Sequence, residues 1–134
     1  MSKRPGRGPL WFCVKFLVLV SVLVTLWWLY VLPAYGWLLM QATGGILKFA
    51  AGMPIEAGRI EAGGVFNTDT MLVFRVGAHE PAIPLAHLVT NVPPYVALVL
   101  ATAGLAFWKR LRVLFYGCLI LFVCHAGFII AIMR

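Results

Sequence analysis

The sequence predicts a mainly α-helical membrane protein, with three transmembrane helices, an interfacial helix and a small external β segment. Hydrophobic residues make up 63% of the 134 residues and charged residues only 11%, which is far more apolar than a soluble domain. The apolar residues also lie in long blocks with almost no charge, as lipid-facing helices require. We therefore expect a single membrane domain over residues 1–134.

Three of these blocks are long enough to cross a bilayer, which takes roughly 20 residues of helix. Residues 10–32 hold one charge, Lys15, while residues 88–108 and 113–133 hold none. The sequence therefore predicts transmembrane helices over these three ranges, preceded by a short tail at residues 1–9.

A cleavable signal peptide is the alternative for residues 10–32, because basic residues precede them. The apolar part of such a signal runs for about 7–15 residues and leads to small residues at the cleavage site. Here the apolar run continues to Trp27, Trp28 and Tyr30 and is followed by Pro33. This pattern favours an uncleaved signal anchor.

The distribution of charge predicts the orientation of the chain. The formal net charge is +7, yet residues 33–87 hold three basic against four acidic residues. The excess of positive charge lies in residues 1–9 and in a predicted tight turn at 109–112, and such residues gather on cytoplasmic loops. The residues expected to set the topology are Lys3, Arg4, Arg7, Lys109, Arg110 and Arg112.

We therefore expect the N-terminus in the cytoplasm, and residues 33–87 and the C-terminus outside, in a bacterial inner (plasma) membrane. Six charges split over two short segments are typical of topology signals, so the expected surroundings are the lipid bilayer and we expect no nucleic-acid partner.

The predicted external segment has two parts. Residues 35–51 are apolar but are interrupted by glycines, Gln41 and Lys48, which favours a helix lying in the membrane interface. Residues 53–84 contain the run MLVFRV, rich in branched and aromatic side chains and bounded by turn residues, which predicts two or three short strands.

No metal or cofactor site is predicted. His79, Glu80 and His87 are close in the sequence but lack the spacing of metal ligands. A haem between His87 and His125 is disfavoured, because His87 is expected at the outer surface and His125 about 12 Å deeper in its helix.

His125 is nonetheless a candidate functional residue, because an ionisable group inside a membrane helix is costly and usually contacts protein. The simplest interpretation is a histidine bonded to a neighbouring helix. Thr90 and Asn91 are the other candidates: they precede Pro93 and Pro94, which suit the first turn of a helix. A side chain at 90 or 91 is then expected to cap that helix.

The order of these features resembles the C-terminal half of the exosortase/archaeosortase superfamily, membrane enzymes that sort proteins carrying a C-terminal tail signal. The stretch MPIEAGRIEAGGVFNTDTMLVFRV resembles the short external β segment of the family. LVTNVPPYVALVLATAG occupies the place of its cysteine-bearing helix, and FWKRLRVLFYGCLILFVCHAGFII resembles its basic turn and following helix. The similarity covers residues 53–134.

The chain departs from that family at the catalytic position. Where the family has its nucleophilic cysteine, this chain has Thr90, Asn91 and Val92, and no arginine matches the membrane arginine of the family. The catalytic roles are therefore not carried over to any residue here. The pattern is most similar to the small membrane proteins associated with exosortase H.

The resemblance implies a non-enzymatic membrane accessory protein of an exosortase-type protein-sorting system, with an exosortase-like membrane protein as partner. Two alternatives stay open. One is a divergent membrane transpeptidase or protease that uses polar residues such as Asn91 and His125. The other is a small structural subunit of an unrelated membrane complex.

Overall fold

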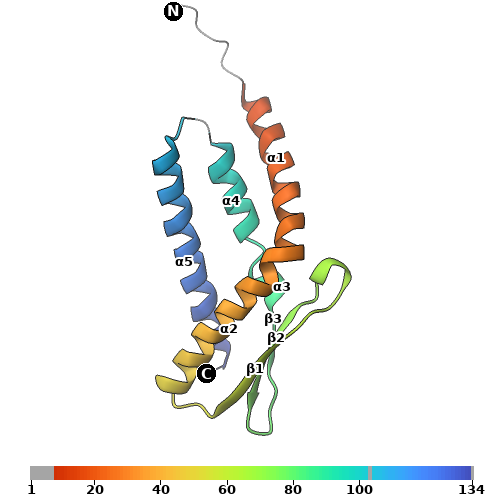
Figure 1. Ribbon diagram of the computed structural model, residues 1–134, viewed down its shortest axis with the longest axis vertical. Coiled ribbons are helices and arrows are strands. Elements are labelled where there is room, and N and C mark those ends of the chain that lie inside the picture. Colours follow the sequence, from red (N-terminus) through yellow and green to blue (C-terminus); the bar gives the residue numbers. More distant parts are fainter. Residues whose placement is uncertain (1–7, 103, 134) are drawn as a thin grey trace, which may run out of the picture.

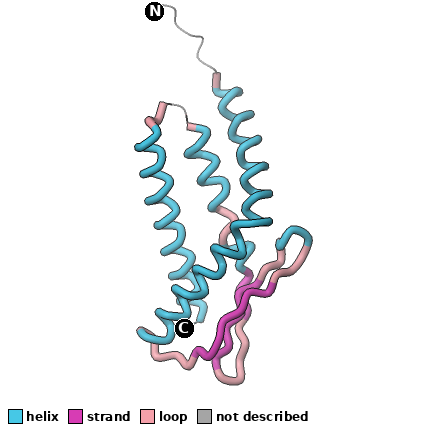
Figure 2. Tube along the Cα trace, in the orientation of Figure 1, coloured by secondary structure: helices cyan, strands magenta, loops and turns pink. Residues whose placement is uncertain are grey.

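The computed structural model describes residues 8–102 and 104–133, and it shows a group of helices with a small antiparallel sheet at one end (Figures 1 and 2). The predicted mainly helical fold with a small β segment is confirmed. The elements, in chain order, are α1 (Pro9–Leu26), a π-helical turn (Trp27–Val31), α2 (Leu32–Phe49), β1 (Ile55–Glu61), a 3-10 turn (Val65–Asn67), β2 (Met71–Val76), β3 (Ala82–Pro84), α3 (Leu85–Leu88), α4 (Val92–Ala101) and α5 (Phe107–Met133).

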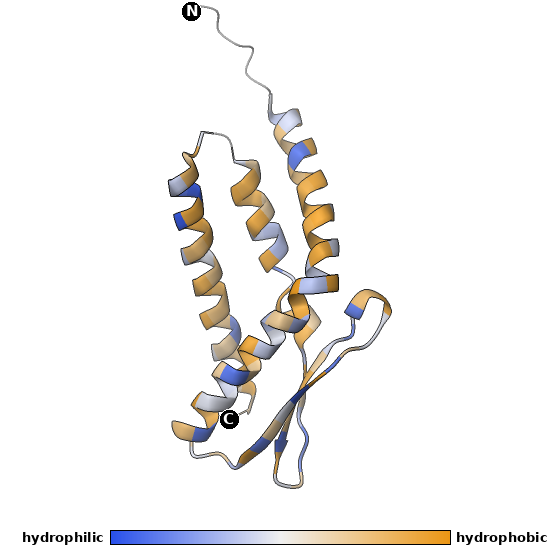
Figure 3. Ribbon diagram, viewed as in Figure 1, coloured by the Kyte–Doolittle hydropathy of each residue, from blue (hydrophilic) through white to orange (hydrophobic). Residues whose placement is uncertain are grey.

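Two helical segments are long and apolar enough to cross a membrane. They are Pro9–Phe49, with 41 residues, and Phe107–Met133, with 27 residues. Only 6% and 17% of their most apolar stretches are buried, whereas the core helix of a soluble protein buries most of its apolar side chains. Figure 3 shows the same hydrophobic colouring over most of α1, α4 and α5.

The first segment differs from the prediction, which ended one helix at residue 32 and began a separate one at residue 35. In the structure α1 and α2 are continuous through the π-helical turn, where the N–H of Leu32 donates to the carbonyl of Trp27. Pro33 follows in the first turn of α2. A proline has no N–H to donate to the carbonyl four residues earlier in a helix. The helix bends at the wider turn before this proline, as Figure 1 shows.

The sheet has the order β1-β2-β3, with both pairs antiparallel. Gly58 lies opposite Phe74, and Leu72 lies opposite Ile83. These residues form the face that packs under α2. The glycine at position 36 permits the close approach, since a Cβ there would collide with the Leu85 side chain. The buried cluster below α2 includes Leu32, Leu39, Leu72, Phe74, Ile83, Leu85, Ala86, Val89, Ala126 and Ile129.

The second predicted membrane helix is shorter in the structure. Residues 88–108 were expected to be helical, but α4 ends at Ala101, Thr102 is extended and Gly104 has φ +88°. The predicted turn at 109–112 is also wrong, because α5 begins at Phe107 and contains these residues. Lysine and arginine are good helix formers, so their charge does not indicate a loop. The connection between α4 and α5 instead contains Gly104, whose left-handed backbone conformation favours glycine.

The helices pack in a row, with α1 against α4, α4 against α5, and α2 against α5. The start of α1 and the α4–α5 connection lie at one end of the molecule, whereas the sheet and the end of α5 lie at the other (Figure 1). Between α4 and α5, Tyr95 Oη donates to the Val113 carbonyl at 2.6 Å. A Cβ on Gly117 would collide with this tyrosine hydroxyl, so the glycine makes the contact possible.

Candidate functional site

A chain of hydrogen bonds joins three separate parts of the fold at His125. Its Nδ1 lies 2.8 Å from the Tyr35 hydroxyl of α2. Its Nε2 lies 3.1 Å from Oδ1 of Asn91, the residue that precedes α4. His125 itself is on α5 and only 4% exposed, so the polar atoms of this buried ring are bonded to protein on both sides.

The chemistry of these groups sets the direction of the bonds. An amide oxygen only accepts, so Nε2 carries the proton and donates to Asn91. In the neutral ring Nδ1 is then an acceptor, and the Tyr35 hydroxyl donates to it. The result is a directed relay from Tyr35 through His125 to Asn91.

Aromatic rings surround the Tyr35 end of the relay. The ring centroids of Tyr35 and Phe122 are 5.8 Å apart at 87°, and those of Tyr35 and His125 are 6.0 Å apart at 81°. Trp27 lies against the same tyrosine at 5.3 Å. Edge-to-face pairs of this kind are favourable, and they fix the tyrosine ring so that its hydroxyl reaches the histidine.

The structure brings together two of the three predicted site residues, Asn91 and His125, and leaves the third apart. Thr90 is exposed and its hydroxyl donates to the His87 carbonyl at 3.0 Å. Asn91 is at the N-cap position of α4, as expected, but its side chain makes no capping bond because its oxygen accepts from His125. Pro93 lies in the first turn of that helix, as predicted.

Sequence reasoning named Asn91 and His125 together in the enzymatic alternative and did not single out Tyr35. Asn91 and His125 meet in the structure because α4 begins beside α5 about 12 Å before the end of α5, eight residues at 1.5 Å each. Tyr35 was missed because the helix containing it was expected to lie apart in the interface. The feature of the sequence that could have indicated it is a tyrosine, with its polar hydroxyl, two residues after Pro33 in an otherwise apolar stretch.

Of the predicted topology-setting residues, Lys3, Arg4 and Arg7 lie outside the described residues. Lys109, Arg110 and Arg112 lie in the first turns of α5. Arg110 has a structural contact as well, since its Nη2 donates to the Thr102 carbonyl at 2.9 Å. This bond gives a charged donor to a carbonyl at the C-terminal end of α4, where helix carbonyls lack partners within the helix.

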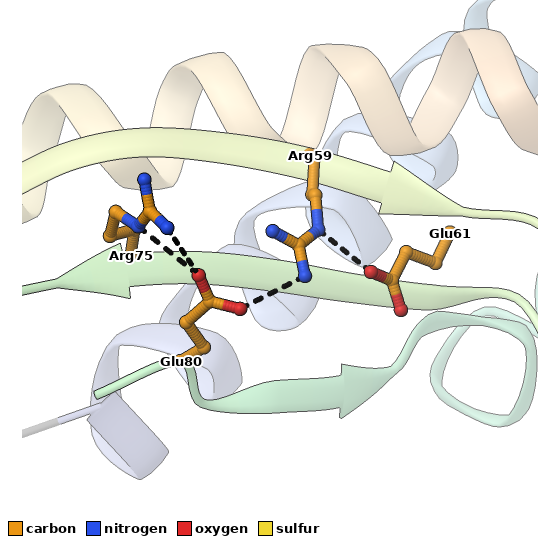
Figure 4. A network of polar contacts seen from close by, with 4 residues as sticks. All are labelled: Arg59, Glu61, Arg75 and Glu80. Atoms are coloured by element: carbon orange, nitrogen blue, oxygen red, sulfur yellow. Dashed lines mark hydrogen bonds and ion pairs between the residues drawn. The ribbon is translucent and has the colours of Figure 1, made fainter. Parts of the chain in front are cut away.

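A second polar network lies on the exposed face of the sheet (Figure 4). Arg59 pairs with Glu61 at 2.7 Å and with Glu80 at 2.9 Å, while Arg75 reaches the other oxygen of Glu80 at 3.1 Å. The hydrogen bond and charge of Arg59 lower the pKa of Glu80 from its usual value. The bond to Glu61, followed by that to Glu80, raises the pKa of Arg59.

A pocket of about 450 Å³ opens between α2 and β1. Three glycines contribute to its walls, Gly44 and Gly45 from α2 and Gly58 from β1. Its remaining lining residues are Met40, Gln41, Lys48, Phe49, Ile55, Glu56, Ala57 and Phe74.

Over the described residues, 8–102 and 104–133, no group of three or more His, Cys, Asp or Glu side chains comes together as a metal site would require. His79 is in the β2–β3 connection and His87 is in α3. The order tyrosine, histidine, asparagine matches the arrangement of nucleophile, base and orienting group used in covalent catalysis, but the histidine at its centre is buried.

No family model, no curated protein and no solved structure matches this chain.

Proposed function

We propose that this chain is a non-enzymatic integral membrane protein that serves as an accessory component of an exosortase-type protein-sorting system. The observation that carries the non-enzymatic part is the buried His125, both of whose ring nitrogens bond to side chains from other elements. A general base passes the proton that it takes up to a substrate group and so has to lie within reach of the substrate, whereas the His125 ring is only 4% exposed. A histidine that joins α5 to α2 and to the start of α4 holds helices together instead.

Three membrane crossings are proposed, with the N-terminus in the cytoplasm and the C-terminus outside. In support, α1 and α5 run in the same direction along the molecule (Figure 1). If both cross a bilayer, the chain has to return between them, along α4. The basic residues at the start of α5 lie at the same end as the start of α1, which agrees with the preference of basic residues for the cytoplasm.

The shortness of α4 is compatible with a crossing because its end is bonded to protein. Ten residues of helix span about 15 Å, so part of the return path is not helical. Irregular backbone at membrane depth is tolerated where protein satisfies it. The bond from Arg110 to the Thr102 carbonyl and the bond from Tyr95 to the Val113 carbonyl tie this part of α4 to α5.

Reporter fusions test the topology. Alkaline phosphatase joined after Arg134 is expected to be active, because the enzyme folds only outside the cytoplasm, and a fusion after Leu105 is expected to be inactive. Green fluorescent protein at the same two sites gives the opposite pattern. An active phosphatase at Leu105 would mean that α4 does not complete a crossing.

The sorting system is proposed from the resemblance of residues 53–134 to the small proteins associated with exosortase H. The test is purification of the tagged chain in a mild detergent from cells that contain an exosortase. Recovery of the exosortase in stable proportion supports the proposal. Recovery of the chain alone, or with subunits of a respiratory or transport complex, contradicts it and favours the role of a structural subunit elsewhere.

An enzymatic role is the second candidate, and the relay from Tyr35 through His125 to Asn91 is the observation that favours it. In that case the Tyr35 hydroxyl would be the nucleophile and His125 its base. Asn91→Ala and His125→Ala would then each abolish processing of a tail-signal protein without lowering the amount of this chain. Normal processing with both variants would exclude this candidate.

A further inference from the structure

The loop between β1 and β2, residues 62–70, has an exposed apolar tip. Its 3-10 turn begins with Val65 and Phe66, which are 73% and 63% exposed. Neither side chain belongs to the buried cluster below α2. Contact of such side chains with water is unfavourable, so an apolar neighbour would stabilise the tip.

The backbone of the tip adopts a conformation that does not suit phenylalanine. Phe66 has φ +58° and ψ +33°, and Asn67 has φ +62°, so both lie in the left-handed region. Asparagine tolerates this region, whereas a bulky side chain adopts it at an energetic cost. Glycine or asparagine at position 66 would form the same turn with less strain. The geometry of the turn therefore does not explain why a large apolar side chain is held there.

A hydrogen bond fixes the tip beside the π-helical turn. Nδ2 of Asn67 donates to the carbonyl of Trp28 at 3.1 Å. Within the helix that carbonyl would accept from residue 32 or 33. The N–H of Leu32 donates to the carbonyl of Trp27, and Pro33 has no N–H. Asn67 thus supplies the donor that the proline lacks, and the loop is tied to the bend between α1 and α2.

This bond also sets the depth of the tip in the membrane. The 18 residues of α1 span about 27 Å, close to the hydrocarbon thickness of about 30 Å. If α1 crosses the bilayer, the π-helical turn lies at the outer edge of the hydrocarbon. Trp27, Trp28 and Tyr30 in that turn are the residue types enriched at this level. Figure 1 shows the loop beside the bend, with the rest of the sheet extending away from α1.

The surface next to the tip is apolar and exposed as well. Leu29, Tyr30 and Val31 of the π-helical turn are exposed, and this turn contacts the 3-10 turn of the loop. Only 6% of the most apolar stretch of Pro9–Phe49 is buried, so its exposed side chains would face lipid in a membrane. The same lipid would surround the tip.

The loop is suited to the interface and not to the hydrocarbon core. The amides of Thr68, Asp69 and Thr70 donate to carbonyls of the same loop, as a segment in contact with lipid requires. The Asp69 side chain is exposed, and a carboxylate is costly at greater depth. Glu61, which precedes the loop, is paired with Arg59.

We propose that Val65 and Phe66 insert into the outer interface of the membrane and anchor the β1–β2 loop on the lipid beside α1. This anchoring rests on the proposed crossing by α1, but it requires neither an exosortase nor a complete crossing by α4.

The test measures the surroundings of a fluorescent dye, NBD, attached to single cysteines of the full chain in phosphatidylcholine vesicles. The labelled variants are Phe66→Cys in the tip, Ala78→Cys in the connection at the other end of β2, and Val18→Cys on the exposed surface of α1. Three quenchers are compared: a lipid with a nitroxide near its headgroup, a lipid with a nitroxide deep in its acyl chain, and iodide in the water. The native cysteines replaced by alanine are Cys13, Cys118 and Cys124.

We expect the dye at Phe66→Cys to be quenched most by the shallow nitroxide and to be protected from iodide. The dye at Ala78→Cys should be quenched by iodide, and the dye at Val18→Cys by the deep nitroxide. Iodide quenching at 66 with nitroxide quenching at 18 overturns the anchoring alone. Iodide quenching at 18 as well contradicts the crossing by α1 and the anchoring together. Protection at 66 from all three quenchers assigns the tip to a contact with a second copy and also overturns the proposal.

A second variant separates the phenylalanine side chain from the backbone of the loop. Phe66→Asn is expected to keep the turn, because asparagine suits the left-handed conformation, but it removes the apolar side chain. With the dye at Val65→Cys, this substitution should abolish most of the quenching by the shallow nitroxide and introduce quenching by iodide. Phe107→Asn is the control, an exposed phenylalanine at the start of α5, and should leave the dye at 65 unchanged. Equal quenching with Phe66 and with Phe66→Asn would contradict the anchoring role.

Discussion

The molecule contains two polar networks of similar size in opposite surroundings. One joins Tyr35, His125 and Asn91 through a buried imidazole between helices. The other joins two arginines and two glutamates on the exposed face of the sheet. The first connects elements distant in the sequence, whereas the second lies on a sheet that its backbone hydrogen bonds and its buried face already stabilise. The two networks have bonds of similar length but are expected to contribute very different amounts to stability.

The difference follows from the loss of water on burial. Breaking a hydrogen bond to a buried group leaves a partner unsatisfied, which costs about 1–3 kcal/mol. When an exposed ion pair is broken, water solvates both charges, so such a pair contributes little to stability. Substitutions in the contacts between the helices are therefore expected to lower the stability of the fold. Substitutions in the exposed network of the sheet are expected to change mainly how that stability depends on salt and pH.

The largest effect is expected at the α4–α5 contact. Gly117→Leu places a side chain where the Tyr95 hydroxyl lies, and overpacking of this kind costs about 1–3 kcal/mol or more. Thermal unfolding in detergent, followed by tryptophan fluorescence, should show a clear drop in midpoint. Gly127→Leu, on the same helix in open space, is the control, and equal midpoints for both variants would contradict the packing described here.

The buried relay is expected to give the next largest effect. Asn91→Leu leaves the Nε2–H of His125 without its acceptor, at a cost of about 1–3 kcal/mol. Thr90→Val is the control, because the adjacent threonine is exposed and bonds only its local backbone. The double variant of Asn91→Leu with His125→Leu should be less destabilised than the sum of the two single variants. Strict additivity would show that the two residues do not interact.

A smaller effect is expected where Arg110 bonds the end of α4. Arg110→Ala removes a charged donor from the Thr102 carbonyl, and contacts of a cation with a helix C-terminus contribute about 0.3–1 kcal/mol. Arg112→Ala removes the same charge from the same helix without removing that bond. A lower midpoint for Arg110→Ala than for Arg112→Ala is the expected result, and the reverse order would contradict the capping role.

The smallest effect is expected on the sheet. Because the pKa of Glu80 is lowered in the folded chain, its contribution is present above the pKa of an ordinary glutamate and is lost as the pH falls through the lowered value. Glu80→Gln should therefore remove a small pH dependence in the acid range and a small salt dependence, with little change at neutral pH. A large loss of stability at neutral pH would mean that the sheet depends on this network.

The sequence was sufficient for what depends on composition and local pattern. The apolar blocks gave the helical character, the run at 71–76 gave a strand, and Pro93 gave the start of α4. Boundaries set by backbone geometry were not predictable: the π-helical turn before Pro33 keeps the first helix continuous, and the left-handed Gly104 lies in the connection that precedes α5, which already contains the basic residues. Asn91 and His125 were singled out as polar residues in an apolar setting, but their meeting depends on how α4 lies beside α5.

Tyr35→Phe tests the central claim, that the relay holds helices and performs no chemistry. The variant removes only the hydroxyl, which is the would-be nucleophile, and Tyr30→Phe is its exposed counterpart in the same continuous helical segment. The measurement is the processed fraction of a tail-signal protein, in cells where that processing depends on this chain, at equal amounts of the variants in the membrane. Normal processing is expected with Tyr35→Phe. Loss of processing at an unchanged amount of chain would assign a catalytic role to the relay and contradict a purely structural one.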